Sequence, residues 1–496
     1  MNKQIRRLAV ALLACYLILF VQLNVLAVGR QQELNADPRN NRQTERDFNR
    51  PRGSILAVDG TVLARSVPTA RGDQFRYQRE YPLGYLFGNV TGYYTFSFGS
   101  TQLERTQNDV LMGDTTEQRL RAIGGLFRGA DATGSVVLTM RPDVQQVAAD
   151  ALGTREGSVV VMDPHTGAII AMVSNPRYNP ADVAVHDSKQ AEAVLTYLNA
   201  QPGKPLLANA YQERYMPGSS FKVITTSIAF ENGATTLDRV FPVSKSWLPP
   251  QTTDPITNYG GEACGGTMVE VFYRSCNIPF AQLASELGPQ LMVDGAKKWG
   301  VGEKVPIDLP APAASHFGEV SDFTDQLPLL AIGGFGQGNT TMVPLQMAMV
   351  ASTVANGGVM MKPHVIDATL DHGGGVLSRT TPSVWKTPIL PTTADTLTNL
   401  MIGVVKLGTG RPMQLAGGIQ AAAKTGTAQL NTTGPERSNA WIIGFAPAAA
   451  PQYAIAVVLK GGPNDAISAS TGGRLAGPIA KQVLDYLFAH PAPTTG

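Results

Sequence analysis

Two residues near the middle of the chain have the types and spacing of a nucleophile and its base. Ser219 and Lys222 follow a Pro-Gly pair, and an apolar run from Val223 to Phe230 comes after them. This pattern predicts a buried helix with both side chains on one face at its start. A desolvated lysine amine can accept a serine proton, and a helix N-terminus favours the developing negative charge. Alone the pair is weak evidence, because Ser-x-x-Lys occurs by chance in many proteins.

Ser275 and Asn277 are a second pair with catalytic potential. We expect both side chains to point the same way from an extended turn, because they are two residues apart. The hydroxyl can relay a proton, and the amide can hold a substrate carbonyl and the lysine. Taken alone, an ordinary turn or helix start explains such a pair better.

A third group, Lys424, Thr425, Gly426 and Thr427, follows three alanines. On an edge strand, Lys424 and the threonine hydroxyls suit a substrate carboxylate, and Gly426 allows a ligand to approach the backbone. The backbone N–H groups of Thr427 and Ser219 are candidates for an oxyanion hole, where one donor is typically worth about 3–4 kcal/mol. The three groups in this order form a strong joint signal, although each alone is common.

Apolar segments predict the elements that position these groups. We expect strands at 135–139, 158–162, 168–172, 440–445 and 453–459, and helices at 142–152 and 477–488. Strands at both ends of a helix-rich middle indicate one sheet built from distant segments, hence one large α/β domain over residues 135–490.

Residues 30–134 are expected to form a polar spacer followed by a smaller domain. Two apolar runs around Asp59-Gly60 predict a β-hairpin there. This region has no nucleophile with a nearby base, so we expect it to serve as a pedestal or docking domain. After the large domain, residues 491–496 are predicted to be a disordered tail.

Residues 1–29 are typical of a membrane anchor. Three basic residues precede an uncharged run from Leu8 to Gly29, which as a helix spans roughly 33 Å. Basic residues before the span predict a cytoplasmic N-terminus and an extracytoplasmic remainder. A cleaved signal peptide is one alternative, and lipidation of Cys15 is another, although the apolar run continues well beyond that cysteine. We expect an uncleaved, single-pass anchor in the cell membrane.

The remaining cysteines and the histidines bear on disulfides and metals. Cys264 and Cys276 lie in the part expected outside the cell, where two cysteines favour a disulfide over free thiols. Two separately buried thiols are the alternative. The 6 histidines are scattered without ligand spacing, so we predict no metal site and no cofactor.

The overall composition excludes several other classes. The chain has 40 Lys plus Arg against 38 Asp plus Glu, giving a net charge of +2, and contains no long basic block. Such near balance argues against nucleic acid as a partner. A content of 43% hydrophobic and 16% charged residues excludes a disordered or coiled-coil chain.

The three groups together are those of penicillin-binding proteins and class A β-lactamases. The chain resembles a class B penicillin-binding protein, and its short layout is most similar to the actinobacterial members. The resemblance covers nearly everything after the membrane segment. Further matching blocks are Arg52-Gly53, 59–64, Gly302 with 307–310, Gly336-Gln337-Gly338 with 344–348, and Ala440-Trp441 with 444–447. Family members usually have Asp-Arg before the first glycine, whereas this chain has Pro51-Arg52 before Gly53.

This resemblance implies a fold. We expect an α/β (α+β) transpeptidase domain of the serine β-lactamase type, with helices on both sides of a sheet and an all-helical lobe. A small β-rich domain of the dimerisation type and one transmembrane helix precede it. Actinobacterial relatives pair the cysteine at position 276, which supports a Cys264–Cys276 bridge.

The resemblance also implies a reaction. Ser219 attacks the penultimate D-Ala carbonyl of a peptidoglycan stem peptide, Lys222 acts as base, and Ser275 returns a proton to the departing D-Ala. The substrate-binding residues are Asn277, Lys424, Thr425, Gly426 and Thr427. An amine of a neighbouring stem peptide then resolves the acyl-enzyme, whereas β-lactams acylate Ser219 and remain attached. Glycan polymerisation is expected to need a partner glycosyltransferase, together with proteins of division or cell-shape maintenance.

Other activities share these groups. A D,D-carboxypeptidase uses water as acceptor, and a non-catalytic β-lactam-binding scaffold keeps the groups without turnover. A class A β-lactamase needs a deacylating Glu in a Glu-x-x-Leu-Asn segment, and the nearest segment here, 285–288, does not match. The complete set of groups argues against an idle scaffold. We expect a D,D-transpeptidase, and a D,D-carboxypeptidase stays as the alternative because the motifs are common to both.

Overall fold

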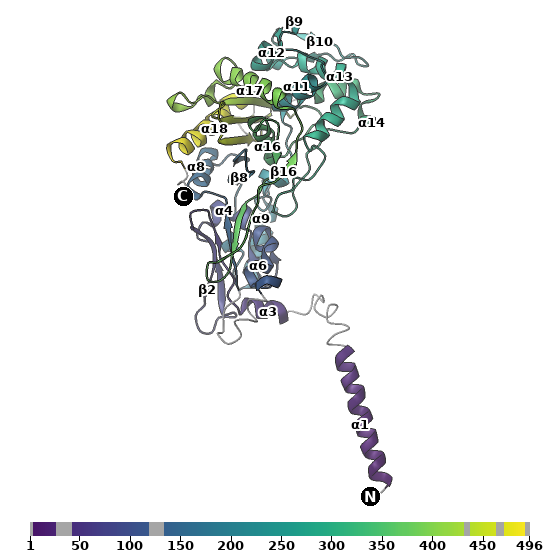
Figure 1. Cartoon of the computed structure of the whole chain (residues 1–496), viewed down its shortest axis with the longest axis vertical. Coiled ribbons are helices and arrows are strands. Elements are labelled where there is room, and N and C mark those ends of the chain that lie inside the picture. The colour runs from purple at the N-terminus through teal and green to yellow at the C-terminus, as the bar shows by residue number, and fades with distance from the viewer. Residues whose placement is uncertain (1–2, 26–41, 119–132, 431–436, 463–470, 492–496) are drawn as a thin grey trace.

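The computed structural model describes residues 3–25, 42–118, 133–430, 437–462 and 471–491. The end of the predicted membrane span, most of the predicted spacer and nearly all of the predicted tail lie outside these residues. Within them, Figure 1 shows an N-terminal helix, a pedestal and a larger domain above the pedestal.

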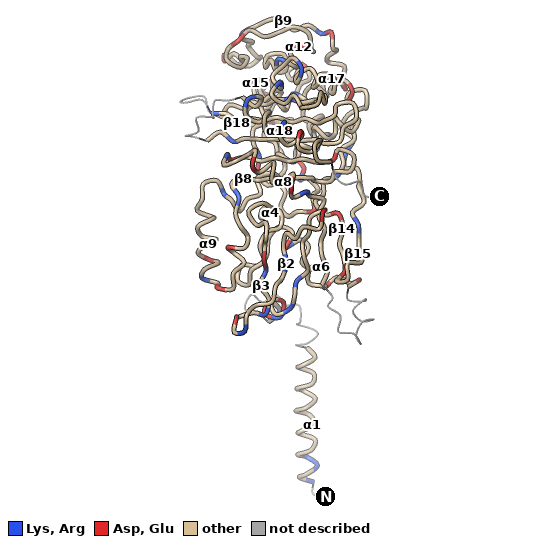
Figure 2. The backbone as a smooth tube through the Cα atoms, turned by 90° about the vertical axis from the view of Figure 1, so that its left-hand side faces the viewer, with Lys and Arg blue, Asp and Glu red and all other residues tan. Residues whose placement is uncertain are grey.

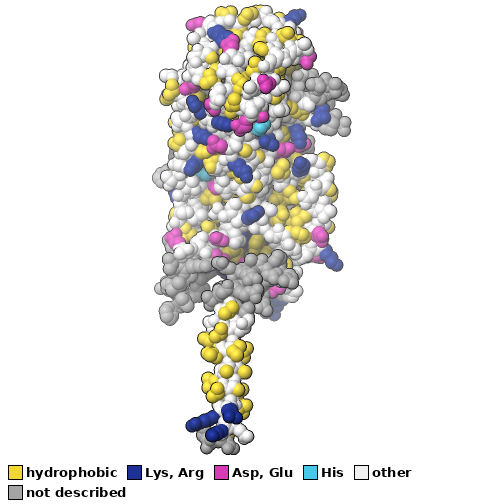
Figure 3. Space-filling model, turned by 90° about the vertical axis from the view of Figure 1, so that its right-hand side faces the viewer, with side chains coloured by type: hydrophobic (Ala, Val, Ile, Leu, Met, Phe, Trp, Pro, Cys, Tyr) yellow, Lys and Arg dark blue, Asp and Glu magenta, His cyan; other side chains and the backbone are white. Residues whose placement is uncertain are grey.

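The N-terminal helix α1 (Lys3–Asn24) has no buried residue. Figure 3 shows hydrophobic side chains along it, with basic side chains gathered at its N-terminal end. In the described part of the chain it is the one helix long and apolar enough to cross a membrane. This finding fits membrane anchoring.

The larger domain is built on a five-stranded antiparallel sheet with the order β17-β18-β19-β7-β8. Its strands are β7 (Gly157–Met162), β8 (Ile169–Asn175), β17 (Ala422–Gln429), β18 (Ser438–Ala446) and β19 (Tyr453–Leu459). The expected strands at 158–162, 168–172, 440–445 and 453–459 are confirmed, and so is one sheet assembled from distant segments. β17 is an edge strand.

Both faces of this sheet are covered, which explains the long apolar runs in β7, β8, β18 and β19. Val159 and Val161 of β7 pack on the side of α8 (Pro142–Leu152) and α18 (Gly472–Ala489). Val160 and Met162 pack into the other core, with α16 (Pro344–Ala355). The alternation along one strand thus divides the domain into two hydrophobic layers.

A helical lobe lies against the α16 side of the domain. Its main helices are α11 (Lys222–Glu231), α12 (Met268–Arg274), α13 (Ile278–Lys298), α14 (Val320–Phe323), α15 (Leu327–Gly333) and α17 (Pro391–Lys406). Smaller elements of the larger domain are α10 (Asn209–Gln212), β9 (Val240–Ser244), β10 (Ser246–Trp247), β11 (Ile256–Thr257), β12 (Cys264–Thr267), β13 (Met360–Met361) and β16 (Val384–Lys386). The helix α9 (Ser188–Ala200) lies beside the pedestal, where Leu195 packs in a small cluster with Tyr93 and Tyr178. The expected mixed fold with helices on both sides of a sheet is confirmed.

The pedestal contains a six-stranded sheet with the order β15-β14-β6-β1-β2-β3. Its strands are β1 (Ile55–Leu56), β2 (Val62–Pro68), β3 (Tyr77–Glu80), β6 (Ser135–Leu138), β14 (Ile366–Leu370) and β15 (Val376–Arg379). The predicted hairpin around Asp59-Gly60 is present as β1 and β2. The expected boundary at residue 134 passes through this sheet, because β6 pairs with β1 and β14 joins from far along the chain.

The rest of the pedestal is helical or lies in short hairpins. These elements are α3 (Arg42–Phe48), α4 (Gly84–Thr91), β4 (Tyr94–Thr95), β5 (Gly99–Ser100), α5 (Gln102–Thr106) and α6 (Asn108–Met112). Figure 2 shows acidic and basic residues mixed over the pedestal and the larger domain, as expected from the near-balanced composition.

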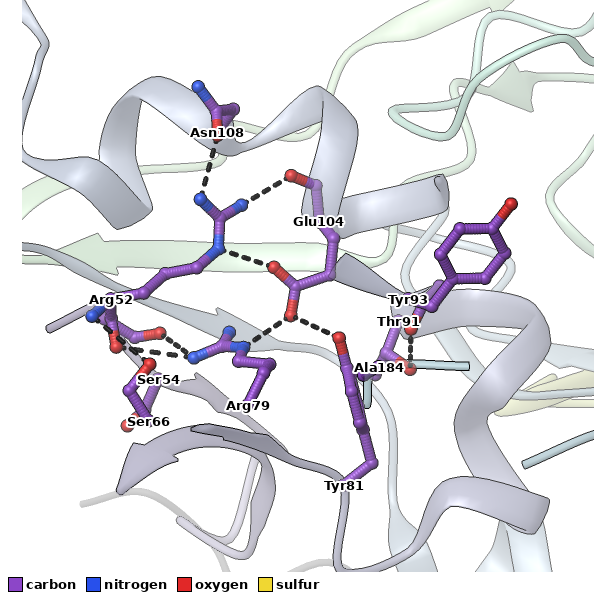
Figure 4. A network of polar contacts seen from close by, with 12 residues as sticks. Arg52, Ser54, Ser66, Arg79, Tyr81, Thr91, Tyr93, Glu104, Asn108 and Ala184 are labelled. Carbon is purple, nitrogen blue, oxygen red and sulfur yellow. Dashed lines mark hydrogen bonds and ion pairs between the residues drawn. The ribbon is translucent and has the colours of Figure 1, made fainter. Parts of the chain in front are cut away.

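A buried ion network fixes the start of the pedestal (Figure 4). The Glu104 carboxylate accepts from Nε of Arg52 and from Nε of Arg79, both at 2.7 Å, and from the Tyr81 hydroxyl at 3.2 Å. Burial acts to raise the pKa of Glu104, but Arg79 and Arg52 outweigh it, so the pKa lies below its ordinary value. The carboxylate therefore stays ionised and contributes stability above the unfolded-state pKa, which is lost as pH falls through the folded-state pKa.

We expect Glu104→Gln to lower the free energy of unfolding by about 3–5 kcal/mol, because it leaves two buried guanidinium groups without a counter-charge. The matched control is Glu80→Gln. Glu80 pairs with Arg65 at 3.0 Å in solvent, where such a pair is worth roughly 0–1 kcal/mol. Denaturant unfolding of the full chain in detergent measures both changes, and equal effects of the two substitutions would contradict the prediction.

Candidate active site

Ser219 lies in a 3₁₀ turn, η3 (Gly218–Phe221), which leads directly into α11. The sequence predicts that an α-helix begins at Ser219. In the structure Ser219 lies in the tighter 3₁₀ turn, and the α-helix begins at Lys222. Gly218 has a positive φ of 54°, and a Cβ at this position would lie 2.5 Å from the carbonyl oxygen of Thr427. Glycine thus lets the turn pack directly on β17. The half-buried Ser219 hydroxyl makes no hydrogen bond to another described residue.

Lys222 is completely buried at the first residue of α11. Its Nζ donates to the carbonyl oxygens of Ser275 at 2.8 Å and Cys276 at 2.7 Å, and to Oδ1 of Asn277 at 2.9 Å. Burial, followed by the positive charge of Lys424, lowers the pKa of Lys222 well below its ordinary value. The amine is thus fixed in place and can lose a proton more easily than a solvated lysine.

Ser275 and Asn277 occupy a tight turn between α12 and α13 and are not part of the extended turn expected from their spacing. Ser275 is the C-cap of α12 with a left-handed φ of 63°, and Asn277 is the N-cap of α13 in the right-handed region. Oδ1 of Asn258 accepts hydrogen bonds from the backbone N–H groups of Asn277 and Ile278. The turn still brings both side chains to the lysines.

Cys264 and Cys276 form a disulfide in the structure, with their Cα atoms 5.7 Å apart. The bond joins the start of β12 to the turn that carries Ser275 and Asn277. It therefore cross-links the chain beside the second group.

Lys424 is buried on the edge strand β17. Its Nζ donates to Oγ of Ser275 at 2.8 Å and to the carbonyl oxygen of Thr425 at 3.0 Å. Burial lowers the pKa of Lys424 to about 7. Ser275 therefore stands between the two lysines, with its carbonyl on Lys222 and its hydroxyl on Lys424.

The two threonines of β17 face the same cleft, whereas Gly426 does not line it. Oγ1 of Thr425 shares a hydrogen bond of 2.5 Å with Oγ1 of Thr409, and Oγ1 of Thr427 accepts from the Gly472 N–H at 3.2 Å. A Cβ on Gly426 would lie 2.3 Å from the carbonyl oxygen of Pro217. We expected Gly426 to let a ligand approach the backbone. In the structure the Pro217 carbonyl of the same chain occupies that position instead.

All three groups open into one cleft of about 480 Å³. Its lining residues are Ser219, Thr257, Asn258, Tyr259, Gly260, Gly261, Arg274, Ser275, Asn277, Gln337, Thr409, Pro412, Thr425, Thr427, Gln429, Thr471, Gly473 and Arg474. No three or more His, Cys, Asp or Glu residues in the described ranges form a group that could hold a metal ion.

Several lining residues escaped the sequence analysis. Gln337 lies in the Gly-Gln-Gly block, which was a usable signal, and its Nε2 donates to the Thr427 carbonyl oxygen at 3.4 Å. Arg274 directly precedes Ser275, but no sequence pattern distinguishes an arginine that lines a cleft from any other exposed arginine. Thr409 and Arg474 lie in segments that match no motif.

The two lysines predict a bell-shaped pH dependence of acylation by benzylpenicillin. The rate should rise as Lys222 loses its proton and fall above about pH 7, where Lys424 loses the charge that attracts the inhibitor's carboxylate. In Lys424→Arg the alkaline limb should move to higher pH, because a guanidinium stays charged. Stopped-flow acylation from mildly acidic to alkaline pH tests this. An alkaline limb that stays in place in the arginine variant would contradict the assignment to Lys424.

Comparison with known proteins agrees with this geometry. Residues 157–485 match the penicillin binding protein transpeptidase domain, and residues 52–137 match the penicillin binding protein A dimerisation domain. The chain belongs to the penicillin-binding protein transpeptidase family. With its dimerisation domain it is a class B member, as its sequence motifs predict.

Relatives match over the whole chain. The peptidoglycan D,D-transpeptidase PbpA of Mycolicibacterium smegmatis is 37% identical, over 98% of both chains. Its namesake from Mycobacterium tuberculosis is 35% identical, over 98% of this chain and 99% of the relative. A ceftriaxone acyl-enzyme complex of penicillin-binding protein A from M. tuberculosis has a TM-score of 0.83 and 33% identity, covering 89% of this chain and 99% of that one. A penicillin G acyl-enzyme complex of the same protein has a TM-score of 0.80.

Proposed function

We propose that this protein is a peptidoglycan D,D-transpeptidase that cross-links stem peptides through an acyl-enzyme on Ser219. The observation that carries this proposal is the buried Lys222 amine: Lys222 directly follows the Ser219 turn, and its amine is hydrogen-bonded to the Ser275–Asn277 turn. The relatives named D,D-transpeptidase and the β-lactam acyl-enzyme complexes of a similar protein support it.

Acylation begins when Lys222, in its neutral form, takes the proton of the Ser219 hydroxyl. Oγ of Ser219 bonds to the penultimate D-Ala carbonyl carbon, and the bond from that carbon to the terminal D-Ala nitrogen breaks. The backbone N–H groups of Ser219 and Thr427 are proposed to stabilise the oxyanion. Lys222 contacts Ser275 through its carbonyl oxygen, and Lys424 contacts the Ser275 hydroxyl. We assign to this hydroxyl the return of a proton to the leaving amine.

Substrate binding is assigned to the other groups. The Asn277 amide orients the donor, and the Lys424 ammonium with the hydroxyls of Thr425 and Thr427 binds the terminal carboxylate. Gly426 contributes by allowing β17 to pack against the Ser219 turn. In the second half-reaction an amine of another stem peptide attacks the ester carbon, an amide forms, and Ser219 is released.

Membrane placement and partners follow from the same proposal. α1 is proposed to anchor the protein, and its basic N-terminal end supports a cytoplasmic N-terminus with the catalytic domain outside. Because the proposed reaction joins peptides and makes no glycan, the protein is proposed to act with a glycosyltransferase and with division or cell-shape proteins.

A product assay tests the proposal. The full chain in detergent is incubated with a pentapeptide stem ending in D-Ala-D-Ala and an amine-bearing acceptor stem, and products are identified by mass spectrometry. We expect a cross-linked dimer together with free D-Ala, and neither product from Ser219→Ala. Free D-Ala without dimer would identify a carboxypeptidase, and penicillin labelling without either product would identify a non-catalytic scaffold.

A further inference from the structure

Two arginines give one end of the catalytic cleft a positive charge. Arg274 is the last residue of α12, and Arg474 lies in the first turn of α18. Both side chains are exposed and line the cleft. None of the described lining residues is acidic, although the whole chain has nearly equal numbers of acidic and basic residues.

Neither arginine forms an ion pair with a described residue. The Arg274 guanidinium donates to the carbonyl oxygens of Gly265 at 3.2 Å and Ala263 at 3.3 Å, which hold it in place without neutralising it. Arg474 occupies a helix N-terminus, where the helix dipole favours acidic residues. The positive charge of Arg474 is therefore repelled by the positive end of the helix dipole. A bound anion would offset this repulsion.

Both arginines adjoin the groups assigned to the departing D-Ala. Arg274 directly precedes Ser275, whose hydroxyl returns a proton to the leaving amine. Arg474 directly follows Gly473, and the preceding N–H of Gly472 donates to Oγ1 of Thr427. Both arginines therefore line the cleft from segments that also carry residues assigned to the leaving group.

Thr409 connects the two arginine-bearing segments. Its N–H donates to the carbonyl oxygen of Tyr273 at 3.3 Å, and its Oγ1 bonds to Oγ1 of Thr425. A Cβ on Gly473 would lie 2.2 Å from the Thr409 carbonyl oxygen. The end of α12 and the start of α18 therefore both pack against Thr409, on the side of the cleft that binds carboxylate.

In transpeptidation the attacking amine must enter where the D-Ala amine left, because the amide bond formed replaces the amide bond broken at the same carbon. The departing D-Ala carries a carboxylate on the carbon that bears its amine. An acceptor with the same α-amino carboxylate group places its own carboxylate at the same end of the cleft. An acceptor whose amine ends a plain methylene chain has no such charge.

We propose that Arg274 and Arg474 form an acceptor subsite that selects amines with a carboxylate on the same carbon. This inference rests on the proposed transpeptidase function. The acceptor amine enters the step neutral. Its nitrogen bonds to the acyl carbon, the ester bond to Oγ of Ser219 breaks, and the amine proton passes through Ser275 and Lys222 to Oγ of Ser219. The arginines take no part in proton transfer and act only by attracting the carboxylate.

The test compares D-alanine with D-alaninamide, which has the same carbon skeleton but lacks the carboxylate charge and has a less basic amine. The full chain in detergent is acylated with a D-alanyl thioester donor, and the ratio of transfer to the two acceptors is measured at equal concentrations. The variants are the double substitution Arg274→Gln with Arg474→Gln, and its charge-retaining counterpart Arg274→Lys with Arg474→Lys. Arg105→Gln removes an exposed arginine from the pedestal and is the control.

We expect the D-alanine to D-alaninamide ratio to fall about fivefold in the double glutamine variant, the size expected for two exposed charge pairs. The double lysine variant should keep most of the preference, and Arg105→Gln should keep all of it. Comparing the ratio between wild type and variants cancels the difference in amine basicity, and each ratio is independent of the amount of folded enzyme. An unchanged ratio in the double glutamine variant, with the donor still acylating Ser219, overturns the acceptor subsite alone. Failure of the donor to acylate the wild type overturns the proposed function itself.

Discussion

Replacing Ser219 by alanine should abolish covalent labelling by benzylpenicillin and leave the fold intact. The Ser219 hydroxyl has no hydrogen-bond partner among the described residues and faces the cleft, so its removal breaks no internal contact. We expect the melting temperature to change little, because substitutions without lost contacts typically cost within about 0.5 kcal/mol. Intact mass after incubation with benzylpenicillin gives the labelling directly, and a stoichiometric adduct on the alanine variant would remove Ser219 as nucleophile.

The neighbouring serine supplies a matched control. Ser220 is buried, and its Oγ donates to the Pro217 carbonyl oxygen at 2.8 Å. Ser220→Ala should therefore lower stability by about 0.5–1.5 kcal/mol while labelling persists. If labelling were lost in Ser220→Ala and kept in Ser219→Ala, Ser220 and not Ser219 would be the nucleophile.

The fate of penicillin in the same experiment separates the related activities. A stable adduct on the wild type is expected, because no Glu-x-x-Leu-Asn segment is present to activate a deacylating water. Penicillin hydrolysed without an adduct would show that another group performs deacylation. Penicillin left intact by the folded wild type would favour a non-catalytic scaffold.

The strands of the large domain could be predicted because both of their faces are buried. Runs such as 159–162 and 454–459 are apolar at every position, which is a strong local signal. The helix at 142–152 matches its prediction residue for residue. The joining of β14 to the pedestal sheet had no local signal, because strand pairing across more than two hundred residues depends on the whole fold.

The start of α18 shows a limit of another kind. The sequence predicts a helix from Gly477, because Gly472 and Gly473 normally disfavour helix. In the structure the helix begins at Gly472, where a Cβ would lie 2.1 Å from the Trp441 carbonyl oxygen. Tight packing on β18 therefore requires glycine and overrides helix propensity.

The order of the three motifs selected Ser219, Ser275 and Lys424 as candidates without locating them relative to one another. The structure brings their segments to one cleft. Their convergence depends on glycine-mediated packing of η3 on β17 and on the left-handed Ser275. Neither feature could be predicted from a sequence pattern. Serine rarely adopts a positive φ, so nothing in the sequence indicates the left-handed conformation of Ser275.

Lys222→Ala should slow acylation by benzylpenicillin about 10²–10⁴-fold, the range for losing a general base. The substitution also leaves three acceptors on residues 275–277 without their donor, so lost activity alone does not separate chemistry from structure. Lys222→Arg supplies the separation, because arginine keeps the positive charge and the donors but cannot act as a base.

If Lys222 is the base, both variants should be slow, and a small added amine should partly restore acylation in Lys222→Ala by entering the space that the side chain left. If Lys222 only positions the Ser275–Asn277 turn, Lys222→Arg should approach the wild-type rate and added amine should have no effect. Lys304→Ala, at an exposed site, controls for loss of a lysine elsewhere. Stopped-flow acylation rates, measured under one set of conditions, decide between the two roles. Only the base hypothesis predicts that a small added amine restores acylation, because a free amine does not hold the backbone of the Ser275–Asn277 turn in place.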